Sequence, residues 1–95
     1  MRRAAKVDAN HADVVKALRQ VGCSVCDLSA VGRGCPDLLV TMPDYPFLTI
    51  LMEIKDGKKP PSARKLTPDQ EKFHRTWKGQ IVTVTSVDEA LGNVL

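Results

Sequence analysis

Two acidic residues and a lysine stand in or beside the most apolar segments of the chain. Asp37 precedes one apolar run, and Glu53 and Lys55 end a second run that begins at Phe47. Side chains alternate between the two faces of a strand, so Glu53 and Lys55 should project from the same face. Two carboxylates without soft donors suit Mg²⁺ or Mn²⁺, and a neighbouring lysine could orient or deprotonate a water that attacks a phosphodiester.

The pairing of the two apolar runs decides whether the acids meet. Residues 43–46 contain two prolines and form a turn, so residues 37–42 and 47–55 should make an antiparallel hairpin. If paired residue numbers sum to 90, Asp37 lies opposite Glu53, with Cβ atoms about 4.5–5.5 Å apart. If they sum to 89, Asp37 falls on the other face and the site needs a bulge. The simpler alternative is an exposed charged end of a sheet.

Two amides could complete such a site. Gln70 precedes Phe73 by three residues, so it points inward with the apolar face of its helix, although it could instead close a capping box with Thr67. Asn10 lies four residues before Val14, which places its side chain along a buried stripe unless it only caps the helix. An inward amide needs a hydrogen-bond partner, which the lysine or a metal-bound water could supply.

The elements that must position these residues alternate between helices and strands, and the chain length suits a single domain over residues 1–95. Residues 1–7 read as a loose basic arm, and residues 56–66 as an exposed basic loop in which two adjacent prolines exclude a helix. The predicted order is a helix from Asp8 or Asn10 to about Val21, strands over 23–28, 37–42 and 47–55, a helix from Thr67 that stops at Gly79, a strand over 80–85 and a helix from Ser86 through Val94.

The charge distribution favours a polyanion as partner. The formal net charge is only +3, but residues 55–78 contain eight Lys or Arg against three Asp or Glu, which indicates a phosphate-facing surface or simply a solvated face. Binding through phosphates should be salt-sensitive and weak in sequence preference. The candidate DNA-binding residues are Lys58, Lys59, Arg64 and Lys65 in the basic loop and Arg33 in the glycine-rich segment 30–36.

Hydrophobicity, core composition and the cysteines bear on the location, the oligomeric state and a candidate zinc site. No segment approaches the ~20 apolar residues of a membrane span, which predicts an intracellular, cytoplasmic protein without membrane contact. A small core poor in aromatic residues makes a homodimer plausible. A zinc site could in principle be formed by Cys23, Cys26, Cys35 and either His11 or His74. However, side chains three positions apart on a strand point to opposite faces, so Cys23 and Cys26 should not bind one ion together. We therefore interpret the cysteines as small buried residues and the histidines as surface or rim residues.

Three motifs carry a family resemblance. Residues 32–40 (GRGCPDLLV), 51–57 (LMEIKDG) and 66–70 (LTPDQ) resemble the PD-(D/E)xK nucleases, and among these the chain is most similar to the VRR-NUC family. The resemblance implies a restriction-endonuclease-like α-β-β-β-α-β core, with a mixed sheet flanked by helices. It also implies a metal site formed by Asp37, Glu53 and the backbone carbonyl of Ile54, with Lys55 as catalytic lysine and Gln70 as accessory glutamine.

The resemblance also suggests a function. Small stand-alone members of the family, found in phages, are similar to Holliday-junction resolvases and act as homodimers. We therefore expect a Mg²⁺- or Mn²⁺-dependent DNA endonuclease that selects branched DNA or Holliday junctions, as in DNA repair; the alternative is a DNA-binding subunit with the nuclease fold and little activity alone. Many relatives have a glutamate in the first helix, where this chain offers Asn10, His11 or Asp13. Asn10 has the best facing for a further metal ligand but no charge.

Overall fold

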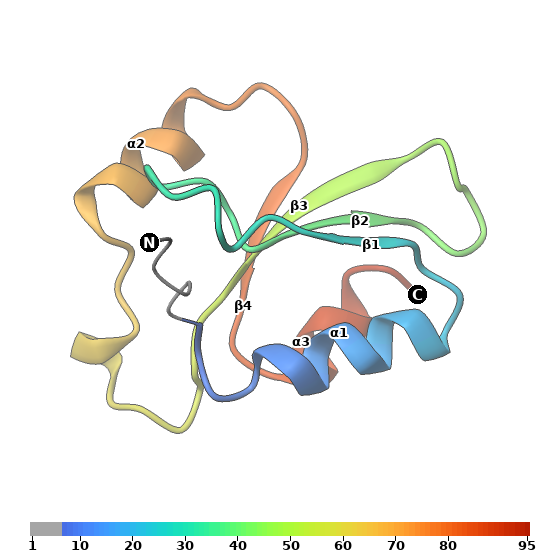
Figure 1. The fold of residues 1–95 in the computed structure, drawn as a ribbon, viewed down its shortest axis with the longest axis horizontal. Helices are drawn as coiled ribbons and strands as arrows, with labels where there is room; N and C mark the ends of the chain where they lie inside the picture. The colour runs from blue at the N-terminus through green and yellow to red at the C-terminus, as the bar shows by residue number, and fades with distance from the viewer. Residues whose placement is uncertain (1–6) are drawn as a thin grey trace, which may run out of the picture.

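The computed structural model describes residues 7–95, and Figure 1 shows three α-helices arranged about a small sheet. Apart from Val7, the basic arm expected over 1–7 lies outside the described residues. The elements are α1 (His11–Gln20), β1 (Val25–Asp27), β2 (Leu38–Thr41), β3 (Thr49–Ile54), the short 3₁₀-helix η1 (Pro61–Ala63), α2 (Pro68–Thr76), β4 (Ile81–Val84) and α3 (Val87–Gly92).

The sheet contains both strand orientations. Its four strands run in the order β1-β2-β3-β4. The first three are antiparallel neighbours, and β4 returns beside β3 in parallel after the crossover through α2. The α/β class, the α-β-β-β-α-β order and the mixed sheet flanked by helices are therefore confirmed.

The β2–β3 hairpin has the register that places Asp37 opposite Glu53. Leu38 pairs with Met52 and Val40 with Ile50, so paired numbers sum to 90. One residue beyond the Leu38–Met52 pair, Asp37 stands across from Glu53. The hairpin thus places both acids on one face, and no bulge is required.

One face of the sheet carries the core. The even-numbered side chains of β2 and β3 point toward α1 and α3, which lie side by side against the sheet (Figure 1). Burial of these aliphatic side chains supplies the main driving force for folding. The cluster comprises Val14, Leu18, Cys23, Leu38, Val40, Ile50, Met52, Ile54, Val84, Ala90 and Val94. The odd-numbered face is thereby left for the acids.

The helix α2 lies apart from α1 and α3 and has no fully buried residue. The helix begins where the sequence predicted, because Thr67 forms a capping box with Gln70 and Pro68 occupies the first turn. Phe73 stacks on Trp77 with ring centroids 5.4 Å apart. Trp77 follows the last helical residue and remains 47% exposed, so this apolar face is only partly covered.

The basic segment 56–66 differs in part from expectation. The prediction that two adjacent prolines exclude a helix was wrong for η1. Pro60 is extended and precedes the helix, and Pro61 occupies the first helical position, where a missing N–H costs nothing. Lys58, Lys59 and Lys65 are exposed as predicted, whereas Arg64 is half-buried.

The glycine-rich segment packs against the start of α2. Gly32, Arg33 and Gly34 all have positive φ angles, of 77°, 57° and 81°. A Cβ atom at Gly34 would overlap the backbone carbonyl of Asp69, whereas one at Gly32 would meet nothing within 4 Å. The absence of a side chain at Gly34 therefore allows the loop to touch α2.

None of the helices within residues 7–95 has both the length and the apolar character required to cross a membrane.

Gly34→Ala should destabilise the protein more than Gly32→Ala. Both substitutions place a Cβ in the left-handed region, at a cost of about 1–2 kcal/mol, but only the first also collides with backbone, which should add about 1–3 kcal/mol. Urea unfolding of both variants beside wild type measures the difference. Equal destabilisation would mean that the loop can move away from α2.

Candidate active site

A pocket of about 320 Å³ opens where β3 ends, beside the start of α2. It gathers the four side chains that the sequence nominated for chemistry together with a third acid and a second lysine. Its lining residues are Val7, Asp8, Asp37, Glu53, Lys55, Lys59, Thr67 and Gln70. The structure therefore brings the predicted residues Asp37, Glu53, Lys55 and Gln70 into one site.

Asp37 and Glu53 are fixed by the hairpin. The Oδ2 atom of Asp37 accepts a hydrogen bond from the backbone N–H of Ile54 at 2.7 Å, which ties the start of β2 to the end of β3. Glu53 is only 2% exposed. The two carboxyl groups thus line one cavity, and Ile54, which follows Glu53 in the chain, is hydrogen-bonded to Asp37.

The environment of Glu53 favours its neutral form. Burial raises the pKa of Glu53 to about 9, and the Asp37 carboxyl adds to the rise through hydrogen bonding and charge repulsion, while Lys55 opposes it. A carboxyl group that must hold a proton beside another acid lacks a compensating positive charge. Ionisation of both carboxyl groups therefore requires a positive charge close to them.

Gln70 connects the catalytic candidates. Its Oε1 accepts hydrogen bonds from Lys55 Nζ at 2.8 Å and from the backbone N–H of Thr67 at 2.9 Å. Its Nε2 donates to Glu53 Oε2 at 3.3 Å. The two alternatives for Gln70, a capping residue and an inward partner of the lysine, therefore hold simultaneously.

His74 also reaches the site, although the sequence favoured a surface or rim position. It lies one turn after Gln70 on α2, and its Nε2 is 3.8 Å from Glu53 Oε1. Burial and the positive charge of Lys55 lower the pKa of His74. Within residues 7–95, neither atom has a hydrogen-bond partner. The i, i+4 spacing from Gln70 was the sequence signal for this position.

Asp8 is the second residue that the sequence analysis missed as part of the site. Its side chain lines the pocket, its charge contributes to the raised pKa of Glu53, and its Oδ1 lies 3.7 Å from Lys59 Nζ. From the sequence, Asn10, His11 and Asp13 in the first helix were considered for this role, whereas Asp8 lies before the helix. The signal was available, since Asp8 is an acid immediately upstream of α1.

Asn10 does not line this pocket. Its Nδ2 donates to the backbone carbonyls of Lys55 at 3.1 Å and Thr85 at 3.2 Å, so it bridges the ends of β3 and β4. It occupies the N-cap position of α1 without a side-chain cap bond. The geometry therefore gives Asn10 a role in holding the strand that carries Lys55, which differs from both roles considered from the sequence.

The candidate DNA-binding residues separate in space. Lys59 lies in the pocket with the acids, whereas Arg33 lines a different pocket against α2. Lys58 borders a third hollow near Asn10, and Lys65 is exposed. Of these residues, Lys59 is thus the one that shares a pocket with the acids.

The donor set fits a hard divalent cation. Asp37 and Glu53 supply carboxylate oxygens, Glu53 Oε1 is buried without a hydrogen-bond partner within residues 7–95, and a backbone carbonyl is adjacent at Ile54. Among the described residues, no group of three His, Cys, Asp or Glu side chains could hold a metal ion. Any cation here would therefore depend on two carboxylates, the backbone and water.

His11 and two of the cysteines lie elsewhere, whereas Cys35 is half-buried near the acids, where burial and the charges of Glu53 and Asp37 raise the pKa of its thiol. Cys23 is buried in the core and Cys26 is exposed. His11 is 6% exposed, contrary to the expected surface position, and its Nε2 lies 2.9 Å from Asp27 Oδ2. This contact joins α1 to β1 on the edge of the sheet.

Comparisons of the chain with models of protein families, with curated proteins and with solved structures found no match.

The raised pKa of Glu53 predicts a pH-dependent stability. In chelator, the native state keeps a proton that unfolded Glu53 releases above about pH 4.5, so the free energy of unfolding should fall as pH rises from about 4.5 to 9. One group contributes at most about 1.4 kcal/mol per pH unit. Glu53→Gln should remove this slope, as measured by urea unfolding across the range. Glu71→Gln, on the exposed side of α2, is the control, and parallel profiles for all three proteins would contradict the assignment.

Asn10→Asp separates a bridging role from a metal-ligand role. A carboxylate cannot donate to the carbonyls of Lys55 and Thr85, so the variant should lose about 1–3 kcal/mol of stability. Exposed Asp13→Asn is the control. Calorimetric titration with Mn²⁺ gives the second measurement, and tighter Mn²⁺ binding by Asn10→Asp would instead identify Asn10 as a ligand.

Proposed function

We propose that this protein is a Mg²⁺- or Mn²⁺-dependent DNA endonuclease of the VRR-NUC type. The single observation that carries the proposal is the pair of acids, half-buried Asp37 and buried Glu53, which face each other across the hairpin beside Lys55. The order of the three motifs in the sequence supports the family assignment. The basic residues around the pocket support a polyanionic substrate.

Asp37 and Glu53 would hold the cation together with the carbonyl of Ile54. When bound, a divalent ion lowers the pKa of water and neutralises charge on a phosphoryl oxygen. Asp37 is already oriented by the Ile54 N–H, and Glu53 by Gln70 Nε2. The two carboxylates therefore need little reorganisation to act together.

Lys55 would act on the phosphodiester or on the attacking water. Its ammonium group is held 2.8 Å from Gln70 Oε1, and Gln70 is in turn anchored to the backbone of Thr67. This chain of contacts fixes a positive charge at the edge of the pocket. Such a charge can stabilise the negative charge that develops on the phosphoryl group, and Gln70 serves as its positioning residue.

The substrate would be DNA recognised by shape. Lys59 lies in the pocket, and Lys58, Lys65 and Arg33 are exposed, so that they could contact phosphates without reading bases. Branched DNA, including Holliday junctions, is the substrate class that the family resemblance favours, in the cytoplasm of a bacterium or phage host. A homodimer would place two such sites on one junction. The exposed apolar residues Phe47 and Leu48 on the hairpin are available for contact between copies.

Substitutions in the pocket should separate cleavage from folding. Lys55→Ala and Glu53→Gln should reduce cleavage of a labelled junction by about 100-fold or more in Mg²⁺ or Mn²⁺, since each removes a charge that acts on the transition state. Thermal unfolding should show that both variants remain folded. Lys65→Ala, an exposed lysine outside the pocket, is the control for loss of basic charge.

A panel of junction, flap, nicked and linear DNA defines the substrate. Full activity in Lys55→Ala or Glu53→Gln would remove that residue from the mechanism. Binding without cleavage by the wild-type protein in either metal would support the alternative, a DNA-binding subunit that needs a partner for activity.

A further inference from the structure

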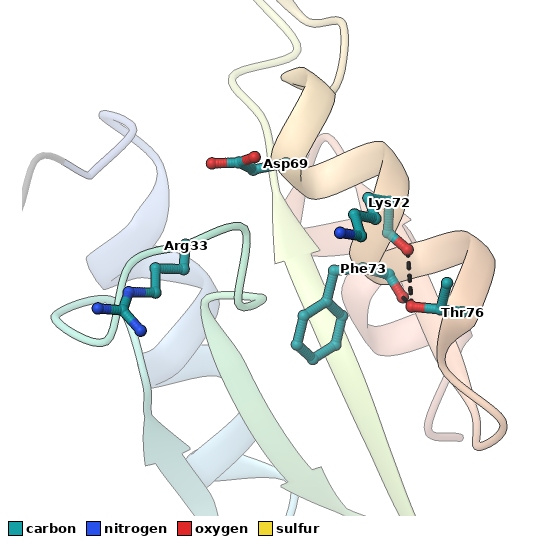
Figure 2. Close-up of a pocket in the computed structure, with 5 residues that line it drawn as sticks. All are labelled: Arg33, Asp69, Lys72, Phe73 and Thr76. Carbon is teal, nitrogen blue, oxygen red and sulfur yellow. Dashed lines mark hydrogen bonds between the residues drawn. The ribbon is translucent and has the colours of Figure 1, made fainter.

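A second pocket, of about 420 Å³, lies between the glycine-rich loop and α2. Figure 2 shows Arg33 on the loop, with its guanidinium group turned away from α2, and Phe73 projecting from the helix toward the space between loop and helix. Asp69, Lys72 and Thr76 complete the lining. The pocket therefore combines an aromatic ring, two cations and a hydrogen-bond acceptor.

Phe73 provides a supported surface for a planar ligand. Its ring is stacked on Trp77 at a centroid distance of 5.4 Å and an interplanar angle of 19°, and it also lines the pocket. Trp77 therefore backs the ring and restricts its motion. An aromatic platform of this kind stacks nucleobases of any sequence.

The charges around the ring suit the rest of a nucleotide. Arg33 and Lys72 outnumber Asp69, so the pocket carries a net positive charge that can attract a phosphodiester. Arg33 holds a positive φ of 57° between two glycines, and the loop is packed on α2 through Gly34. A strained residue held in this way is typical of a functional position.

The two pockets share the helix α2. Asp69, Lys72, Phe73 and Thr76 follow the helical spacing of one face, while Gln70 and His74 form the adjacent stripe that contacts Glu53 and Lys55. Gln70 and Phe73 are separated by less than one turn, about 4.5 Å along the helix axis. A strand whose phosphodiester lies at the acids could therefore place a neighbouring nucleotide against Phe73.

We propose that this second pocket binds one unpaired nucleotide of a DNA strand, with the base stacked on Phe73 and the phosphates near Arg33 and Lys72. The inference rests on the proposed nuclease function and adds to it the feature by which the enzyme would select its substrate. A paired base is stacked within its duplex and cannot reach Phe73. Flaps, bulges and branch points would be bound in preference to continuous duplex.

The test compares two DNA duplexes that differ by a single base. Each contains a one-nucleotide bulge, which is thymidine in one and an abasic residue in the other, so phosphates and overall shape are matched. Fluorescence anisotropy with the full chain in chelator measures binding without cleavage. The thymidine bulge should bind about tenfold more tightly than the abasic bulge, because only it offers a base for stacking.

Matched variants identify the surface that reads the base. Phe73→Leu keeps an apolar side chain but removes the ring face and should abolish the difference between the two bulges, whereas Phe73→Tyr should retain it. Thermal unfolding confirms that both variants are folded. Equal binding of the two bulges by folded wild type, or an unchanged difference in Phe73→Leu, would overturn the assignment.

The same measurements separate this inference from the nuclease proposal. Base-dependent binding by a wild-type protein that cuts no substrate in Mg²⁺ or Mn²⁺ would leave the nucleotide pocket standing and remove the nuclease. Cleavage of branched DNA together with equal affinity for both bulges would leave the nuclease proposal standing and remove the nucleotide pocket. Lys16→Ala, at an exposed position of α1 outside both pockets, should bind both bulges with the wild-type ratio.

Discussion

The opposition of two carboxyl groups across one hairpin is the constraint on which the rest of the structure depends. Leu38 and Met52 pair in the core, and this pairing leaves Asp37 and Glu53 facing each other one residue further along. The register is strongly specified, because a shift of one residue would expose the aliphatic side chains that pack against α1 and α3. Hydrophobic packing on one face of the sheet therefore enforces an unfavourable contact between acids on the other.

The cost of that contact explains the polar groups around it. Glu53 is buried and its pKa is raised to about 9, so ionisation requires a nearby positive charge. Lys55 supplies part of this charge from the same face of β3, and Gln70 holds both residues through its two amide atoms. The divalent cation that we propose between the acids would complete this compensation.

The sequence predicted the sheet and the acids well because both follow from local patterns. Alternation along β3 placed Glu53 and Lys55 on one face, and the proline-containing turn at 43–46 limited the register to two choices, of which the structure has the first. Asp8 and His74 were missed because their proximity to Glu53 depends on how α1 and α2 are placed against the sheet. Asn10 lies on the expected stripe, but its bonds to the Lys55 and Thr85 carbonyls require the parallel neighbour β4. Apart from the i, i+4 spacing of His74 from Gln70, contacts of this kind leave no periodic signal in the sequence.

The helix α2 shows how a weakly packed element can still be positioned accurately. It buries no residue fully, so its place depends on its first turn, where Thr67 and Gln70 form the capping box and Gly34 touches the backbone of Asp69 and Gln70. Gln70 belongs to the cap and to the acidic site at once, so the contact that starts the helix also orients Lys55. A displacement of the glycine-rich loop would therefore change both pockets together. Occupation of the pocket beside Phe73 would press on the same loop and helix, which gives substrate binding a direct physical route to the geometry of Lys55.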